Sequence, residues 1–153
     1  MYYFFRLTTA VNSSNGKEDT FEKILVTIGK TGSLTIESID RLSKVFSVPQ
    51  ISKVKEIMSE IVKVIFKPSN REIWMKLGTD KDYIMYPRVY CSCMDFFLQG
   101  IIKKRKYYCK HLIAQGIVEE LTKNTPNDIE MLEKDENFKE KVTQNLEFEH
   151  FLN

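Results

Sequence analysis

All three cysteines of the chain, and one of its two histidines, fall within a single stretch of twenty-one residues. They form two pairs, each with one residue between its members, and fifteen residues separate the pairs. The four residues are Cys91, Cys93, Cys109 and His111. Three cysteines and a histidine are the ligand set of a closed zinc site, in which four protein side chains leave no coordination position for water or substrate. This stretch constrains the fold most, because its two halves must meet at one point.

The sequence around each pair indicates how the ligands would converge. An aromatic and β-branched run over residues 83–90 predicts a strand, and alternate residues of a strand point to the same side. We therefore expect Cys91 and Cys93 to face the same ion. Residues i and i+2 of an α-helix lie about 200° apart. We therefore expect Cys109 just before a helix and His111 in its first turn.

Two other interpretations of the cysteines stay open. They could be buried structural thiols beside an ordinary hydrogen-bonded histidine, or a disulfide or redox pair with one free thiol. A disulfide within Cys-x-Cys would be strained, and three thiols leave one unpaired. The spacing favours zinc, so we predict one structural Zn²⁺ as the cofactor.

The Cys-x-Cys … Cys-x-His pattern resembles that of SWIM-type zinc fingers, which have the same two pairs with a variable spacer. Ala114, three residues after His111, is similar to the small residue found there in the SWIM subunit of the Shu recombination-mediator complex. The layout of elements over roughly residues 35–122 is similar as well. The resemblance implies a SWIM-type ββα zinc fold. It also implies a partner, a paralogue of a RecA/RadA-type recombinase, and a role in homologous recombination and DNA repair.

The rest of the sequence predicts an α+β fold. Apolar residues at helical spacing follow a turn at residues 12–16 and predict N-terminal helices. They cover residues 20–28, 33–46 and 51–60, with Pro49 ending the second helical region. Runs over residues 62–66 and 73–77 predict two further strands, joined by a turn at Pro68–Asn70, in a small antiparallel sheet. We divide the chain into an arm and helices (1–60), a zinc-finger domain (61–122) and an acidic helical tail (123–153).

The two ends of the chain carry patterns of their own. The apolar residues 1–11 predict a strand or an ordered arm. The tail predicts two amphipathic helices, the first containing Ile129 and Met131–Leu132. The second contains Phe138, Val142 and Leu146.

The net charge is only +2, but it is unevenly distributed. Acidic residues predominate from Glu119 onward. Basic residues gather in the stretch from the first ligand to the last, residues 91–111, which we call the zinc loop. The basic residues are Lys103, Lys104, Arg105, Lys106 and, between two ligands, Lys110. They could offset the negative charge of a three-thiolate zinc site, or contact DNA phosphates. Both interpretations stay open.

Between the ligand pairs, a short apolar helix is predicted. Phe96, Phe97 and Ile101 lie in it and could form a partner surface, although core packing would explain the same pattern.

The sequence shows no Walker-type phosphate loop and no catalytic constellation, so we expect a non-enzymatic protein. No apolar run is long enough for a membrane span. We expect an intracellular protein, cytoplasmic if prokaryotic or archaeal and nuclear if eukaryotic. The first functional hypothesis is an interaction subunit that pairs with the recombinase paralogue and reaches DNA through the complex. The alternative is a DNA-binding transcriptional regulator with a winged-helix-like N-terminal half, in which Gln50, Lys53 and Lys55 read the groove.

Overall fold

The computed structural model describes residues 14–78, 81–105, 107–126 and 128–132. Helices and strands both contribute, which confirms the predicted α+β class. The helices are α1 (Ser14–Thr31), α2 (Ile36–Phe46), α3 (Val48–Ile57), α4 (Met94–Phe96) and α5 (Lys110–Thr122), with a 3₁₀ turn η1 (Met58–Glu60) and a π-helical segment η2 (Phe97–Ile102). The strands are β1 (Ile61–Lys67), β2 (Arg71–Lys76), β3 (Tyr83–Tyr86), β4 (Tyr90–Cys91) and β5 (Asp128–Leu132).

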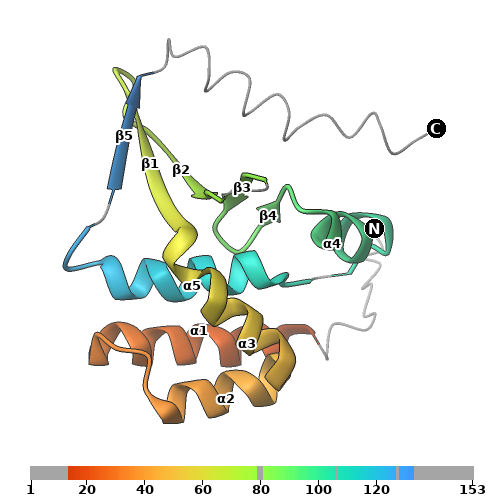
Figure 1. The fold of residues 1–153 in the computed structure, drawn as a ribbon. Coiled ribbons are helices and arrows are strands. Elements are labelled where there is room, and N and C mark those ends of the chain that lie inside the picture. Colours follow the sequence, from red (N-terminus) through yellow and green to blue (C-terminus); the bar gives the residue numbers. More distant parts are fainter. Residues whose placement is uncertain (1–13, 79–80, 106, 127, 133–153) are drawn as a thin grey trace, which may run out of the picture.

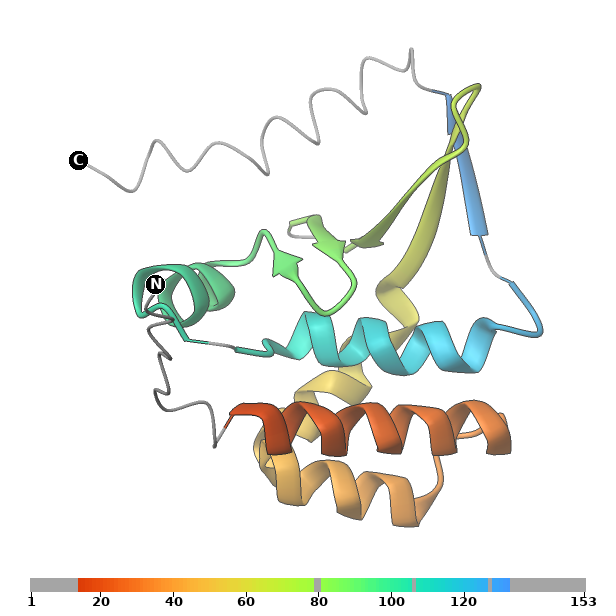
Figure 2. The same cartoon turned by 180° about the vertical axis from the view of Figure 1, so that it is seen from behind.

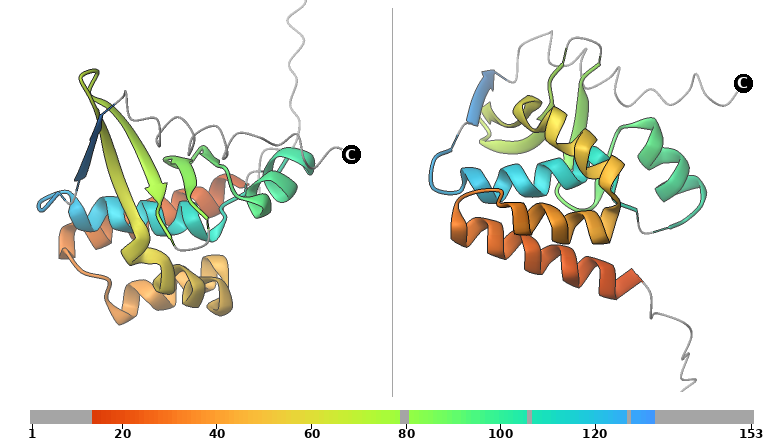
Figure 3. Two further views of the ribbon diagram at one scale, coloured as in Figure 1. Left: turned by 45° about the horizontal axis from the view of Figure 1, so that its top comes forward. Right: turned by 60° about the horizontal axis from the view of Figure 1, so that its bottom comes forward.

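The molecule is built in layers, with α5 between the other long helices and the sheet (Figure 1). Figure 2 shows the same order from behind, with α1 and α2 on one side of α5 and the strands on the other. The views in Figure 3 show α4 and the segment after it standing beyond the end of the sheet, next to the start of α5. None of the described helices is both long and apolar enough to cross a bilayer.

The predicted N-terminal helices are present, with altered ends. Thr35 caps α2 by accepting a hydrogen bond from the Ser38 backbone N–H at 3.2 Å. The turn expected at residues 12–16 is wrong from Ser14 onward, where α1 begins. Pro49 does not end a helix but lies in the first turn of α3, where its missing N–H has no intrahelical partner to lose.

The sheet has the order β4-β3-β2-β1-β5. Strands β1 to β4 pair antiparallel, as predicted, but β5 joins β1 in parallel and makes the sheet mixed. The prediction of a first helix in the tail is therefore wrong, because Ile129 and Met131 lie in β5. Ile129 and Met131 alternate with the polar Glu130, which is the two-residue period of a strand. Such a strand can add to the edge of β1, as β5 does. The expected arm 1–11 and second tail helix lie outside the described residues.

The expected strand over residues 83–90 is interrupted. Residues 87–89 form a turn in which the Val89 N–H donates to the Tyr86 carbonyl at 3.0 Å, and Arg88 has a positive φ of 61°. The result is a tight hairpin of β3 and β4, which a proline after β3 favours. This hairpin, and not one long strand, brings Cys91 to the helical layer.

The main core lies between α1, α5 and the inner face of the sheet. Leu112, Ile113 and Ile117 of α5 are fully buried in it. Gly116 permits the close approach of α1, since a Cβ there would lie 3.1 Å from Leu25 Cδ1. A second apolar cluster occupies the outer face of the sheet and consists of Val64, Phe66, Met75 and Ile84.

Candidate metal centre

Each of the four predicted ligands lies at the end or start of an element. Cys91 ends β4 and Cys93 is the residue before α4. Cys109 is the N-cap position of α5, and His111 is in its first turn, as predicted. Figure 1 shows β4, α4 and the start of α5 gathered at one end of the sheet.

The four side chains converge on one point. Their ligand atoms all lie within 4.8 Å of one another, and all four residues are buried. Cys91 Sγ lies 3.7 Å from His111 Nδ1. Ordinary Zn–S and Zn–N bond lengths in a tetrahedral site give a sulfur-to-nitrogen separation of about 3.6 Å. The donor set and its spacing therefore fit a tetrahedral zinc ion.

Local hydrogen bonds hold the two cysteines that precede helices. Cys93 Sγ accepts from the Phe96 N–H at 3.4 Å, and its carbonyl accepts from the Phe97 N–H at 3.0 Å. The Cys109 carbonyl accepts from the Ile113 N–H at 3.1 Å. Both thiols thus lie at helix starts.

The three thiols do not share one protonation state in the absence of a cation. Hydrogen bonds with Cys109 and Cys93, together with burial, raise the pKa of Cys91. Burial raises the pKa of Cys109, and hydrogen bonds from Cys109 and Cys91 lower the pKa of Cys93. The metal-free site therefore favours one thiolate held by two thiols. A divalent cation is the partner that would allow all three to ionise.

Two residues that the sequence analysis missed support the ligands. The rings of Tyr83 and His111 lie 4.6 Å apart at an angle of 34°. Ser92 Oγ accepts from the Ile84 N–H at 2.9 Å, which ties the segment between Cys91 and Cys93 to β3. Successive residues of an extended segment point to opposite sides, so Ser92, between Cys91 and Cys93, points away from the metal ligands. This alternation is the signal that could have indicated a supporting role for Ser92. Ala114 is fully buried within α5.

The basic residues of the zinc loop divide into two groups. Lys103, Lys104 and Arg105 are exposed at the end of η2, and Lys103 Nζ donates to Gln99 Oε1 at 3.0 Å. Lys106 lies outside the described residues. Lys110 is half-buried and borders two hollows, of about 310 Å³ beside His111 and about 480 Å³ beside Lys53.

The three apolar residues predicted as a partner surface differ in burial. Phe96 is only 8% exposed and its ring contacts that of Tyr90 edge-on at 5.7 Å, so it belongs to the core. Phe97 is half-buried. Ile101 is 45% exposed. Two neighbours that the sequence analysis did not select, Leu98 and Ile102, are 45% and 57% exposed.

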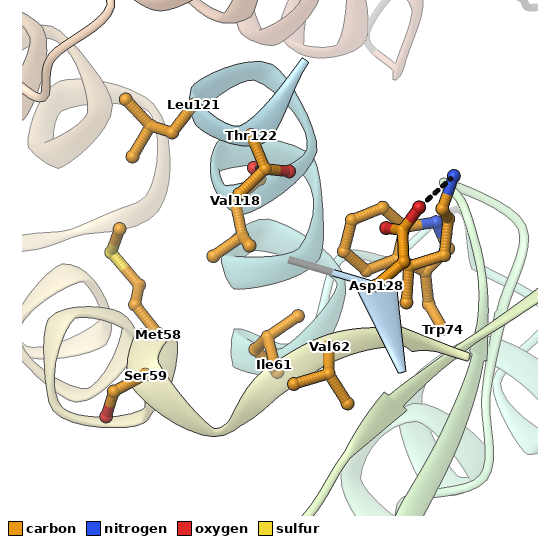
Figure 4. Close-up of a pocket in the computed structure, with 10 residues that line it drawn as sticks. Met58, Ser59, Ile61, Val62, Trp74, Val118, Leu121, Thr122 and Asp128 are labelled. Carbon is orange, nitrogen blue, oxygen red and sulfur yellow. Dashed lines mark hydrogen bonds and ion pairs between the residues drawn. The ribbon is translucent and has the colours of Figure 1, made fainter. Parts of the chain in front are cut away.

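A separate hollow of about 300 Å³ lies between η1, β1, β2 and the end of α5. Figure 4 shows that Met58, Val118 and Leu121 line one side of it, and that Asp128 lies on the other. Lys63 Nζ and Asp128 Oδ2 form an ion pair at 3.3 Å. The hollow therefore offers mainly apolar contacts.

Of the three α3 residues proposed to read a DNA groove, one is engaged in a hydrogen bond within the fold. Lys53 and Lys55 are exposed on α3. Gln50 Nε2 donates to the Tyr108 carbonyl at 3.0 Å. Gln50 thus joins α3 to the segment before Cys109.

Comparison with known proteins finds one similar curated protein, a Zinc finger SWIM domain-containing protein 7 homolog from Dictyostelium discoideum. It is 29% identical over 119 residues, which cover 74% of this chain and 76% of the relative. No protein-family model and no solved structure matches the chain. The similarity and the Cys₃His group together confirm the predicted resemblance to SWIM-type zinc finger proteins.

Proposed function

We propose that this chain is a non-enzymatic zinc-binding interaction subunit that pairs with a RecA/RadA-type recombinase paralogue to promote homologous recombination and DNA repair. The main support is the buried Cys₃His group at the junction of β4, α4 and α5. Four protein ligands would complete a tetrahedral shell, which is the pattern of a structural zinc site. The likeness to a SWIM zinc finger protein supports the same role.

The zinc ion would be held by Cys91, Cys93, Cys109 and His111, and it would supply a positive charge that joins the three thiolates. The residues themselves connect the end of the sheet to the start of α5. They also fix both ends of the loop that contains η2. A loop fixed at both ends costs less conformational entropy to order when a partner binds it.

The partner surface that we propose is the exposed side of η2. Leu98, Ile101 and Ile102 are apolar and between 45% and 57% exposed. Exposed apolar residues that gather on one short segment are typical of interaction sites. The adjoining Lys103, Lys104 and Arg105 are exposed as well, and we propose that they contact DNA phosphates once the complex has formed. We also propose an intracellular location, cytoplasmic or nuclear according to the source.

Affinity purification of the full chain from its native cell tests this function. We expect a recombinase-like ATPase to co-purify with the wild-type chain and with Ile36→Asp, but not with Ile101→Asp. Ile36 is a matched control because it is 87% exposed, apolar and on α2. Recovery of no such ATPase by the wild-type chain would refute the proposal. Loss with Ile36→Asp alone would place the interface on the helical layer instead.

The regulator hypothesis has narrower support. Exposed Lys53 and Lys55 on α3, followed by the β1–β2 hairpin, are compatible with a winged-helix layout. The hydrogen bond from Gln50 to Tyr108 removes one of its three groove-reading residues. Tight, sequence-specific duplex binding by the isolated chain would favour it over the interaction subunit.

A further inference from the structure

The sheet has two apolar faces, and they are covered differently. Register places Ile61, Trp74 and Met85 on the inner face, where they join the main core with α5. Val64, Met75 and Ile84 lie on the outer face. Figures 1 and 2 show α1, α2, α3 and α5 on the inner side of the sheet.

The outer face is nevertheless buried in the isolated chain. Val64 is 0% exposed, Met75 1%, Ile84 3% and Phe66 4%. Neighbouring strands cannot hide such side chains alone, because side chains stand roughly perpendicular to the sheet and leave one open side. Among the described elements, no helix packs on this face. The described elements therefore do not account for the burial of this face.

We propose that the outer face of the sheet is the docking site of this chain's own residues 133–153. This segment follows Leu132 directly, and β5 is the edge strand whose Met131 packs against the outer cluster. Residues 1–13 lead instead into α1, which lies on the far side of α5 from the sheet (Figure 1). The cover therefore starts at the sheet edge where β5 ends.

The sequence of the segment suits this site. Phe138, Val142 and Leu146 recur at every fourth position, which predicts one apolar stripe with charged residues around it. Twenty-one helical residues would span about 30 Å. A five-stranded sheet is about 19 Å across. The segment is thus long enough to cross every strand, and its stripe would cover an apolar face that would otherwise favour aggregation.

Methyl NMR of the zinc-loaded full chain, with ¹³C-labelled methionine methyl groups, tests the proposal. Met75 reports on the outer face and Met85 on the inner face. We expect cross-relaxation between the Met75 methyl group and the Phe138 or Phe148 ring within one chain. Contacts from Met75 to the rings of Phe4 or Phe5 would overturn the proposal. So would contacts between chains in a mixed-label sample, or the absence of any contact from Met75 to the Phe138 and Phe148 rings.

A pair of variants provides a second readout. Val142→Asp should shift the Met75 resonance and remove its contact with the Phe138 or Phe148 ring, because a charge would enter the apolar stripe. Thr143→Asp, a neighbour outside the stripe, should leave Met75 unchanged. Met85 should keep its position in both variants and so shows that the main core remains folded. A Met75 resonance that ignores Val142→Asp, or that moves equally with Thr143→Asp, would contradict the docking of this stripe.

Discussion

Cys91 Sγ and His111 Nδ1 lie 3.7 Å apart, although twenty positions separate these residues in the chain. Cys91 ends β4 and His111 lies in the first turn of α5, so the contact joins the sheet to the central helix. Cys93 and Cys109 complete the group from inside the same loop. Removal of a ligand therefore removes one of the links between these two layers.

Substitution of one ligand should cost both the metal and the fold of the sheet–α5 unit. For Cys91→Ser, Cys109→Ser or His111→Ala, we expect less than stoichiometric zinc and a free energy of unfolding lower by more than about 4 kcal/mol. Elemental analysis and chemical denaturation measure the two quantities. Lys44→Ala, at an exposed position of α2, is the control and should keep its zinc. An unchanged melting temperature in a variant that has lost zinc would show that the metal is dispensable for folding.

Zinc affinity should fall steeply with acid. The pKa values of Cys91 and Cys109 are raised in the metal-free site, by hydrogen bonds and by burial respectively, so these thiols hold their protons at neutral pH. Because zinc binds thiolates, binding releases those protons, and affinity is gained as pH rises and lost as it falls. Since two thiols lose their protons, we expect the logarithm of the association constant to change by roughly two per pH unit between pH 7 and 8. Chelator competition at several pH values measures it, and a flat profile would exclude a thiolate-rich site.

Short-range spacing explains what the sequence predicted well. The start of α5 directly after Cys109 and the place of His111 in its first turn follow from residues within a few positions of one another. The burial of Phe21, Ile24 and Ile28 follows from helical spacing in the same way. These features depend on local geometry, which one sequence contains.

Long-range partners explain what was missed. Ile129 and Met131 form a strand because β1, more than sixty positions away, has a free edge for them. The sequence left Phe96 open between a partner surface and the core, and the β3–β4 hairpin decides for the core by placing the Tyr90 ring against it. Helical and strand patterns in short segments are both compatible with such residues, and tertiary contacts decide between them.

Arg88 is another residue that local patterns could not assign, and its replacement should loosen the contact between α1, α5 and the hairpin. Its guanidinium lies 2.6 Å from Glu22 Oε1 and 3.1 Å from Glu119 Oε2. Burial disfavours its charge, but the two carboxylates more than offset that effect and raise its pKa. Since the side chain is 26% exposed, we expect Arg88→Ala to lower the free energy of unfolding by roughly 1–2 kcal/mol.

Chemical denaturation measures this difference against a matched control. Lys44 and Asp40 form an ion pair at 2.7 Å, with side chains 74% and 60% exposed. Lys44→Ala should cost less than about 0.5 kcal/mol. Equal effects of the two alanine variants would show that the buried contacts of Arg88 add nothing beyond an exposed pair.

Replacement of the basic run should separate its two interpretations. Lys103, Lys104 and Arg105 are exposed, so glutamine at positions 103–106 should change the free energy of unfolding by less than about 1 kcal/mol. If these residues contact phosphates, the DNA affinity of the complex should fall, and the slope of log affinity against log salt should decrease by about three to four. The control is Lys53→Gln with Lys55→Gln, two exposed lysines on α3.

Comparison of the 103–106 variant with the α3 variant decides between the interpretations of these basic residues. Loss of DNA binding only in the 103–106 variant supports contact through the zinc loop. Loss only in the α3 variant supports the winged-helix regulator, whose reading helix would be α3. A fall in zinc affinity of the 103–106 variant, with DNA binding unchanged, would mean that the run instead compensates the charge of the thiolates. The two interpretations of residues 103–106 assign the same cations to different anions, so affinity for zinc and for DNA must be measured on the same variants.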